Sequence, residues 1–255
     1  NCNSSQQQSF KQLESALISW YYKYHPAIAS EHNILEYNKQ IEKYDLNSIE
    51  EYKADINRFM IELSQIDETK LNDNDLIKYL SVNQFLFEKY NYIITFNEFS
   101  YNPKYFLENL YNSIFFIIHN NNLNMEQKTE SILSRLMLFP TSISNIQKNI
   151  INYSKYHIDE SFNLIIAIER LLSNLPLYIN AGESTLNQID DNILNINQKI
   201  KKLKNHFKNI VNKEELDKDK MISNYLIYNK NIKFDLDYKN LINDIHNKML
   251  NISLP

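Results

Sequence analysis

AGESTLNQIDDNILNINQKIKKLKNHFKNI, residues 181–210, is the segment that shows most clearly what kind of fold this chain adopts. Its apolar residues are spaced by alternating steps of three and four: Leu186, Ile189, Ile193, Ile196, Ile200, Leu203, Phe207 and Ile210. This spacing places the side chains on one face of an α-helix. We therefore predict one long helix packed against the rest of the chain, with an intermolecular coiled coil as the alternative.

Glycine is almost absent from the remainder of the chain. Gly182 is the single glycine among 255 residues, whereas average usage is about 7%. β-Sandwiches, barrels and dinucleotide-binding folds need glycine at turns and phosphate loops. The chain also contains 18 Tyr and 13 Phe, an aromatic content that disordered chains lack. These features predict an all-α protein, an irregular up-and-down bundle of about eight to ten helices.

Prolines and capping residues predict where the first helices begin and end. Apolar residues at helical spacing run from Phe10 to Tyr24, and Pro26 stops that pattern and opens a short second helix. Asn33 is expected to end the second helix in the left-handed conformation, a role that asparagine can fill without glycine. Ser48 and Glu51 have the spacing of a capping box and predict the start of the third helix.

Later helices are expected to follow the same signals. We predict starts at Asn72, Pro103 and Asn124. Pro140 is expected to kink or break the helix that it enters, so that a separate helix covers about 141–152. Another helix is expected over about 156–175.

Gly182 marks the clearest boundary along the chain. We expect residues 1–9 to form a flexible tether of the lipoprotein type and residues 10–180 to form the core of the bundle. Residues 181–255 are expected to add the long helix and two C-terminal helices, over about 218–229 and 236–250, packed on the same bundle.

Cys2 is the only cysteine, which excludes an internal disulfide framework and a cysteine-rich zinc module. A short polar segment of Asn, Ser and Gln follows it, as at the mature end of a bacterial lipoprotein whose cysteine carries the lipid. No apolar run approaches the ~20 residues of a membrane span. We therefore predict an exported protein, anchored by a lipid on Cys2 to the periplasmic face of the envelope or to the cell surface. The alternative is a free cysteine at a frayed terminus.

Motifs for catalysis and for cofactors are absent from the sequence. The six histidines form no His-Glu-x-x-His helix, and one glycine cannot build a nucleophile elbow, a P-loop or a dinucleotide fingerprint. His157 and Glu160, three residues apart, are best explained as a hydrogen-bonding pair. We predict no catalytic residue, no metal and no cofactor. With a net charge of −4 and no basic stripe, nucleic acid is not an expected partner.

Residues 20–38, WYYKYHPAIASEHNILEYN, combine an aromatic-x-x-x-Pro-x-x-Ala stretch with a Glu-Tyr turn. Shorter motifs follow in order at 67–80, 102–105, 136–140 and 225–249. Together they resemble the opening of the bacterial domain-of-unknown-function family 885, whose members are helical and often exported lipoproteins. Asn33 stands in the place of a family glycine and Leu35 in the place of a histidine.

The resemblance also defines what this chain lacks. Family members are much longer, and their second half carries a His-Glu-x-x-His zinc helix and resembles zinc metallopeptidases. The resemblance therefore implies the N-terminal helical half, a wall of a substrate cleft, with no zinc or catalytic residue carried over. The polar residues nearest the matched motif are His25, His32, Glu36 and Tyr37, which we take as the candidate functional surface. The alternative for all four is a hydrogen-bonded corner between helices.

Three functional interpretations follow. In the first, the chain is a non-catalytic lipoprotein module that binds a protein or peptide partner. In the second, it is one half of a zinc metallopeptidase that a missing or separate chain completes. In the third, it is a helical surface lipoprotein that binds a host or envelope protein. The first is preferred because the chain carries no catalytic motif.

Overall fold

The computed structural model describes residues 2–152 and 154–211. The chain divides into two units, residues 1–216 and 217–255, and the described helices lie in the first. Over the described ranges the structure has eight α-helices and no strand, which confirms the prediction of an all-α bundle. They are α1 (Cys2–Tyr24), α2 (Pro26–Glu31), α3 (Leu46–Ser64), α4 (Asp73–Lys89), α5 (Pro103–His119), α6 (Met125–Asn149), α7 (Lys155–Ser173) and α8 (Glu183–Ile210). The two helices predicted after residue 217 lie outside the described residues.

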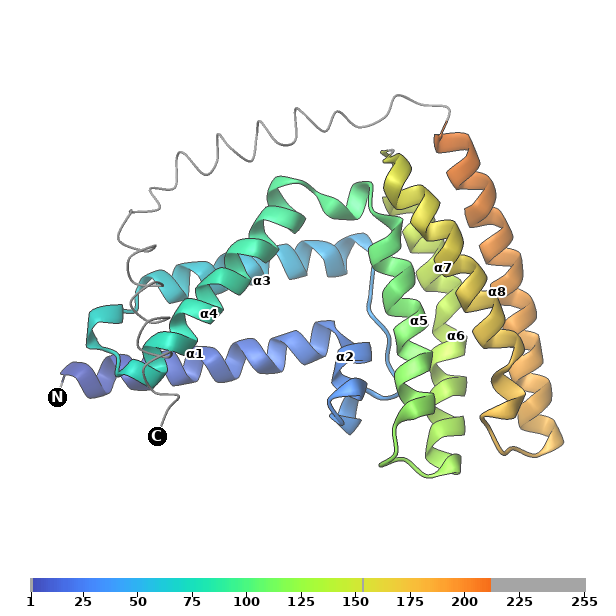
Figure 1. The fold of residues 1–255 in the computed structure, drawn as a ribbon, viewed down its shortest axis with the longest axis horizontal. Coiled ribbons are helices and arrows are strands. Elements are labelled where there is room, and N and C mark those ends of the chain that lie inside the picture. Colours follow the sequence, from blue (N-terminus) through green and yellow to red (C-terminus); the bar gives the residue numbers. More distant parts are fainter. Residues whose placement is uncertain (1, 153, 212–255) are drawn as a thin grey trace, which may run out of the picture. The chain divides into compact units, whose positions relative to one another are not determined.

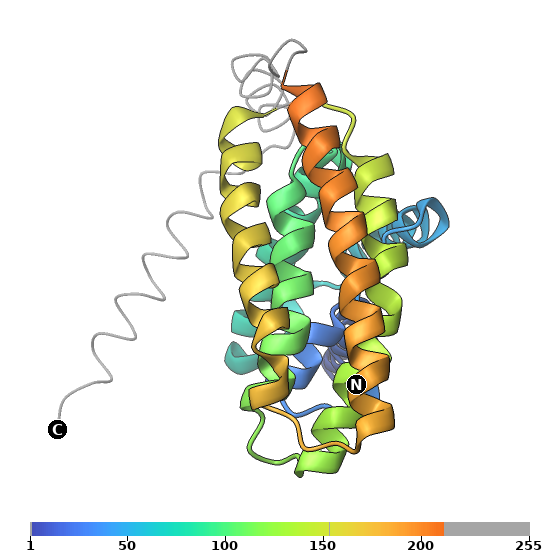
Figure 2. The ribbon, with the colours of Figure 1, turned by 90° about the vertical axis from the view of Figure 1, so that its right-hand side faces the viewer.

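The helices of the first unit form two groups (Figure 1). α5, α6, α7 and α8 run up and down as a four-helix bundle, which Figure 2 shows from its side. Within it, α5 and α8 both pack against α6 and α7. The second group, α1, α3 and α4, runs across the direction of that bundle (Figure 1). The short helix α2 packs on α5 and joins the two groups.

One apolar core connects both groups, from Phe10 in α1 to Ile210 in α8. The predicted seam of α8 faces this core: Ile189, Ile196 and Leu203 have no exposed surface, and α8 packs on α6 and α7 of its own chain. The prediction of a long helix packed within the molecule is therefore confirmed. Burial of such an apolar stripe is what stabilises a helix whose flanks are otherwise polar.

Several predicted helix ends are also confirmed. Pro26 is the first residue of α2 and Pro103 is the first residue of α5. Asn33 has a φ of 62°, the left-handed conformation that was expected after α2. Asn72 caps α4 by accepting a hydrogen bond from the backbone N–H of Asp75 at 2.9 Å. Asn124 forms a capping box with Gln127 at the start of α6.

The predicted N-terminus of α3 is wrong by three residues, because Asp45 and not Ser48 is the N-cap. The helix begins at Leu46, and Asp45 is its N-cap. The Asp45 carboxylate accepts hydrogen bonds from the backbone N–H of Ser48 at 3.1 Å and from the Ser48 hydroxyl at 2.8 Å. Ser48 is thus a hydrogen-bond donor within the first turn and not the N-cap. The Asp45 carboxylate, three residues earlier, accepts the hydrogen bonds that cap the helix.

The break predicted at Pro140 does not occur. α6 continues through Pro140 as one helix of 25 residues. A proline inside a helix costs about 3 kcal/mol, because it removes one backbone hydrogen bond and crowds the preceding turn. Apolar residues before and after Pro140 pack in the core. Their exposed fractions are 0% for Leu136, 1% for Phe139 and 2% for Ile143. Burial of these side chains offsets the cost of the proline.

α1 begins at Cys2, so residues 2–9, expected as a flexible tether, continue the first helix. Residues 2–9 contain neither proline nor glycine. Phe10, the next residue, is completely buried and anchors the following turn of α1 in the core. Further along the segment, the side-chain oxygen of Gln6 accepts a hydrogen bond from the backbone N–H of Asp67 at 3.1 Å. A helix without breakers propagates backward from such an anchored turn.

Candidate functional site

His25 lies in the corner between α1 and α2 and is buried, with 5% of its surface exposed. Its Nε2 is 3.3 Å from the hydroxyl of Tyr52 on α3. Burial lowers the pKa of the His25 imidazole to about 3, and the positive charge of Lys89 acts in the same direction. His25 is therefore neutral at physiological pH and packs as part of the core.

The other three residues of the predicted surface lie on the outside of the same corner. His32 is exposed, and its Nδ1 is 3.0 Å from the hydroxyl of Tyr22. Glu36 is exposed and Tyr37 is half-buried. All four residues lie in the described part of the chain, and within it no hydrogen bond or ion pair joins any two of their side chains. The structure brings them into one corner of the fold but not into one site.

Arg135 holds that corner in place. This arginine of α6 is completely buried. Its Nη2 donates hydrogen bonds to the carbonyl oxygen of Pro26 at 3.2 Å, to the Ser30 hydroxyl at 2.6 Å and to the carbonyl oxygen of Tyr37 at 3.0 Å. Its Nη1 donates to the carbonyl oxygen of Ser113 on α5. One guanidinium thus connects α2, the turn after it, α5 and α6.

Glu42 is a third buried ionisable residue near this corner, with 3% of its surface exposed. Its Oε1 accepts a hydrogen bond from the backbone N–H of Ala27 at 3.1 Å, whereas Oε2 has no partner among the described residues. Burial raises the pKa of the Glu42 carboxyl to about 7, although backbone N–H groups and the charge of Arg135 act in the opposite direction. Burial of the Arg135 guanidinium lowers its pKa to about 10, although the charge of Glu42 acts in the opposite direction.

Residues 38–45 connect the corner to α3 without forming a helix or a strand, and we call them the strap. At its start, Asn38 accepts a hydrogen bond from the Ser30 hydroxyl at 2.8 Å. At its end, the carbonyl oxygen of Tyr44 accepts one from the Asn149 side chain at 2.9 Å, and the Tyr44 hydroxyl accepts another from Asn109 at 2.9 Å. Figure 1 shows the strap as a long connection beside the four-helix bundle. The strap is therefore fastened at both ends.

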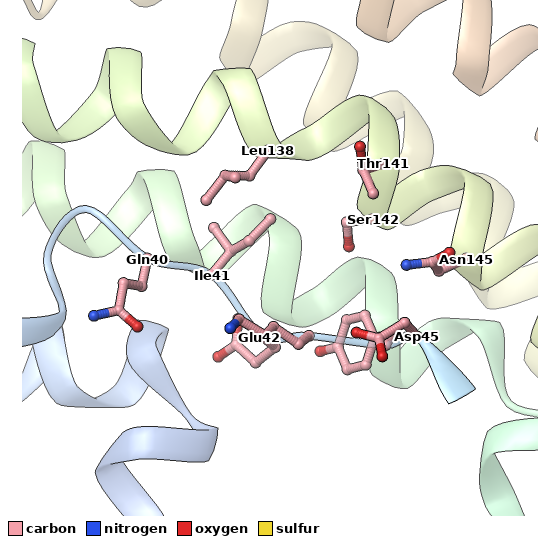
Figure 3. A pocket seen from close by; sticks show the side chains of 10 residues that line it. Gln40, Ile41, Glu42, Asp45, Leu138, Thr141, Ser142 and Asn145 are labelled. Carbon is pink, nitrogen blue, oxygen red and sulfur yellow. The ribbon is translucent and has the colours of Figure 1, made fainter. Parts of the chain in front are cut away.

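A groove lies between the strap and α6, and we call it the strap groove (Figure 3). It has a volume of about 530 Å³, within the range of about 300–1,000 Å³ that is usual for ligand sites. The lining residues are 40–45 of the strap and Leu138, Thr141, Ser142 and Asn145 of α6. The four α6 residues follow each other at helical spacing and form one wall.

The strap groove contains polar groups that the rest of the described chain does not satisfy. The Ser142 hydroxyl and Oε2 of Glu42 are buried and have no hydrogen-bond partner among the described residues. Both residues line the groove. Buried polar groups are rarely left without a partner, so these two atoms single out the strap groove as the candidate site.

A smaller hollow of about 340 Å³ lies between α5 and α7. The rings of Tyr111 and Phe115 stack there with centroids 5.6 Å apart, and Arg170 of α7 also lines it. Among the described atoms, the buried groups without partners do not include any from this hollow. The strap groove is therefore the better candidate site.

Sequence reasoning missed both Arg135 and the strap groove. A signal for Arg135 was present, because Ile132, Leu136 and Phe139 place position 135 on the buried face of the helix. A charged residue on such a face needs partners from other elements. No comparable signal marks the strap, since residues 38–45 have no periodic pattern.

The described residues contain neither a membrane-spanning helix nor a metal cluster. None of their helices is both long enough and apolar enough to cross a membrane. Within the same residues, no three His, Cys, Asp or Glu side chains are grouped so that they could hold a metal ion. Cys2 is the first residue of α1, and its side chain lies outside the described part.

Comparison with known proteins gives one distant structural relationship. No family model and no curated protein matches the chain. The fold is similar to that of a solved protein from Shewanella oneidensis, a predicted lipoprotein of unknown function, with a TM-score of 0.65 and 15% sequence identity. The similarity covers 82% of this chain and 39% of that one, so this chain corresponds to well under half of its neighbour. At this identity the comparison shows a shared fold.

Proposed function

We propose that this chain is a non-catalytic binding module, anchored to the cell envelope through a lipid on Cys2, and that the strap groove is its binding site. The observation that carries the proposal is the pair of buried, unpartnered polar groups, Ser142 Oγ and Glu42 Oε2, beside a cavity of about 530 Å³. A few convergent polar groups in a largely apolar cavity are typical of ligand sites. The candidate surface at His25, His32, Glu36 and Tyr37 has in this proposal the role of supporting the strap.

The anchoring part of the proposal rests on the sequence around Cys2 and gains support from the neighbour of similar fold, itself a predicted lipoprotein. The test is the intact mass of the protein extracted from membranes of its source cells. We expect a mass increase that fragmentation assigns to acyl chains on Cys2. An unmodified Cys2 thiol on protein recovered outside the membrane fraction would contradict the anchor.

The binding part is tested with a photo-crosslinking amino acid, p-benzoylphenylalanine, introduced at Thr141 in the source cells. Thr141 is exposed and lines the strap groove. Met137, one turn earlier on α6 and 62% exposed, does not line it and is the matched control. We expect a covalent adduct at position 141 and none at position 137. Equal labelling of both positions, or of neither, would show that the groove has no resident ligand.

A second candidate function is that of one half of a zinc metallopeptidase, completed by a further chain. The observation in its favour is the length of the structural neighbour, of which this chain matches 39%. Immunoblotting of source cells separates the two candidates. A species near 30.5 kDa with an added lipid supports the binding module, whereas a much larger species that contains zinc supports the peptidase half.

A further inference from the structure

We infer that the strap groove binds a peptide in extended conformation, which pairs as an added β-strand with the backbone of the strap at Ile41 and Lys43. This inference rests on the proposed function of the strap groove and names the class of ligand. It is argued from the unpaired backbone of the strap, from the way the strap is held, and from the wall that faces it.

The middle of the strap has free backbone groups. No described residue makes a hydrogen bond to the backbone N–H of Ile41 or Lys43, or to the carbonyl oxygens of residues 41–43. Ile41 is nevertheless buried, with 5% of its surface exposed. Backbone groups near the interior need a partner, because an unpaired N–H or carbonyl removed from water is costly. Among the described residues neither a helix nor a neighbouring strand supplies one.

The free segment is held rigidly on both sides. Glu42 is tied to α2 through the backbone N–H of Ala27, and Tyr44 is tied to α5 and α6 through Asn109 and Asn149. Before it, Arg135 binds the carbonyl oxygen of Tyr37. A preorganised segment loses little conformational entropy when a ligand pairs with it. This favours strand addition, a mode in which backbone hydrogen bonds supply affinity and side-chain pockets supply specificity.

The spacing of backbone groups in extended chains also favours a peptide. Alternate residues of an extended chain direct their backbone groups to the same edge, about 6.6 Å apart. An extended peptide has the same repeat, whereas a helical peptide already uses its backbone groups internally. A small ligand with one or two polar groups would leave part of this edge unpaired.

The wall formed by α6 offers one apolar and one polar contact for the side chains of that peptide. Leu138 is 42% exposed and lines the groove, and the unpartnered Ser142 hydroxyl lies one turn further along the same helix (Figure 3). We expect an apolar residue of the peptide against Leu138 and a hydrogen-bonding side chain near Ser142.

The probe is a phage-displayed library of linear heptapeptides, selected on the whole chain and followed by synthesis of the enriched sequences. Binding is measured by titration calorimetry against four variants whose folding is checked by circular dichroism. Thr141→Trp fills the strap groove, and Met137→Trp adds the same ring outside it. Lys43→Pro removes one backbone N–H of the strap, and Lys43→Ala changes the same exposed side chain but keeps that N–H. Proline fits an extended backbone.

We expect Thr141→Trp to abolish binding of the selected peptides and Met137→Trp to leave it unchanged. Lys43→Pro is expected to weaken binding about tenfold relative to Lys43→Ala, the effect of one lost hydrogen bond. Amide hydrogen exchange at Ile41 and Lys43 in the unaltered chain should slow at least about tenfold when peptide is bound.

The two proposals fail in different ways. Equal affinities for Lys43→Pro and Lys43→Ala, with unchanged amide exchange, overturn strand pairing but leave the strap groove as a binding site if Thr141→Trp still abolishes binding. Equal affinities for Thr141→Trp and Met137→Trp overturn the groove itself. A library that yields no binder overturns the peptide as ligand, while an adduct at position 141 in cells would still support the proposed function.

Discussion

Arg135 takes the place of an apolar residue on the buried face of α6 and donates hydrogen bonds to three other parts of the fold. Glu42, whose charge raises the pKa of Arg135, makes no ion pair with it within 4 Å. Burial of the two charges is costly, and the cost is met by hydrogen bonds to backbone oxygens and to the N–H of Ala27. The orientation of the strap therefore depends on these two side chains.

Arg135→Met is expected to destabilise the protein by about 3–5 kcal/mol, because the acceptors on Pro26, Ser30, Tyr37 and Ser113 lose their donor inside the core. The measurement is urea unfolding at 25 °C. Arg170→Met is the matched control, since Arg170 is exposed on α7, and it is expected to change stability by less than about 0.5 kcal/mol. Equal losses for the two variants would contradict the role assigned to Arg135.

Glu42 is expected to make stability depend on pH. Its folded-state pKa, about 7, lies above the ordinary value of 4.5, so the folded state binds more protons than the unfolded state between these values. The contribution of Glu42 is therefore fully present below pH 4.5 and is lost as the pH rises through 7.

Glu42→Gln removes this titration. The stability of the variant relative to the unaltered protein should rise by about 3 kcal/mol between pH 4.5 and pH 7.5, the equivalent of the difference between the two pKa values. Urea unfolding at several pH values measures it. A difference that stays constant over this range would show that Glu42 ionises in the folded protein as it does in the unfolded one.

At the scale of the element, α6 is the helix on which both the core and the strap groove depend. Its buried face carries Arg135, its adjacent face carries Leu138, Thr141 and Ser142, and it packs on α5 and α8. Pro140 lies between these residues and has no N–H to donate to the carbonyl oxygen of Leu136. The helix nevertheless continues, so packing alone maintains that turn.

Pro140→Ala should restore the missing backbone hydrogen bond and stabilise the protein by about 1–3 kcal/mol. Thermal unfolding followed by circular dichroism measures the change. Thr141→Ala, at the next and exposed position, is expected to add only a few tenths of a kcal/mol. A loss of stability in Pro140→Ala would mean instead that the shape imposed by the proline is needed for packing on α5 or α8.

At the scale of the described molecule, one core joins the group of α1, α3 and α4 to the four-helix bundle. Trp20, the only tryptophan in the sequence, lies in α1 against Tyr52 and Phe59 of α3, with ring centroids 4.9 and 5.5 Å away. Its fluorescence therefore reports on the first group, whereas the far-ultraviolet circular dichroism signal reports on all helices.

Because the core is shared, both signals should follow the same unfolding transition in urea, with midpoints that agree within the error of measurement. The comparison needs only the unaltered protein. A fluorescence transition at lower urea than the circular dichroism transition would show that α1, α3 and α4 unfold separately from the bundle.

The amino-acid sequence determined the helical class, most helix boundaries and the buried face of α8. These features follow from local chemistry: one glycine in the chain, caps at Asn72 and Asn124, and apolar residues repeating every three or four positions. Local chemistry was insufficient at Pro140 and at residues 2–9, where packing and an anchored neighbouring turn extend a helix past the expected limit.

The tertiary structure alone formed the candidate binding site. The candidate residues His25, His32, Glu36 and Tyr37 are neighbours in sequence, and His25 is buried while the others face outward. The strap groove joins residues 40–45 to residues 138–145, and the arginine that supports it makes hydrogen bonds to residues about a hundred positions away. Such a site arises when distant segments pack together, and periodicity along the chain carries no information about which segments meet.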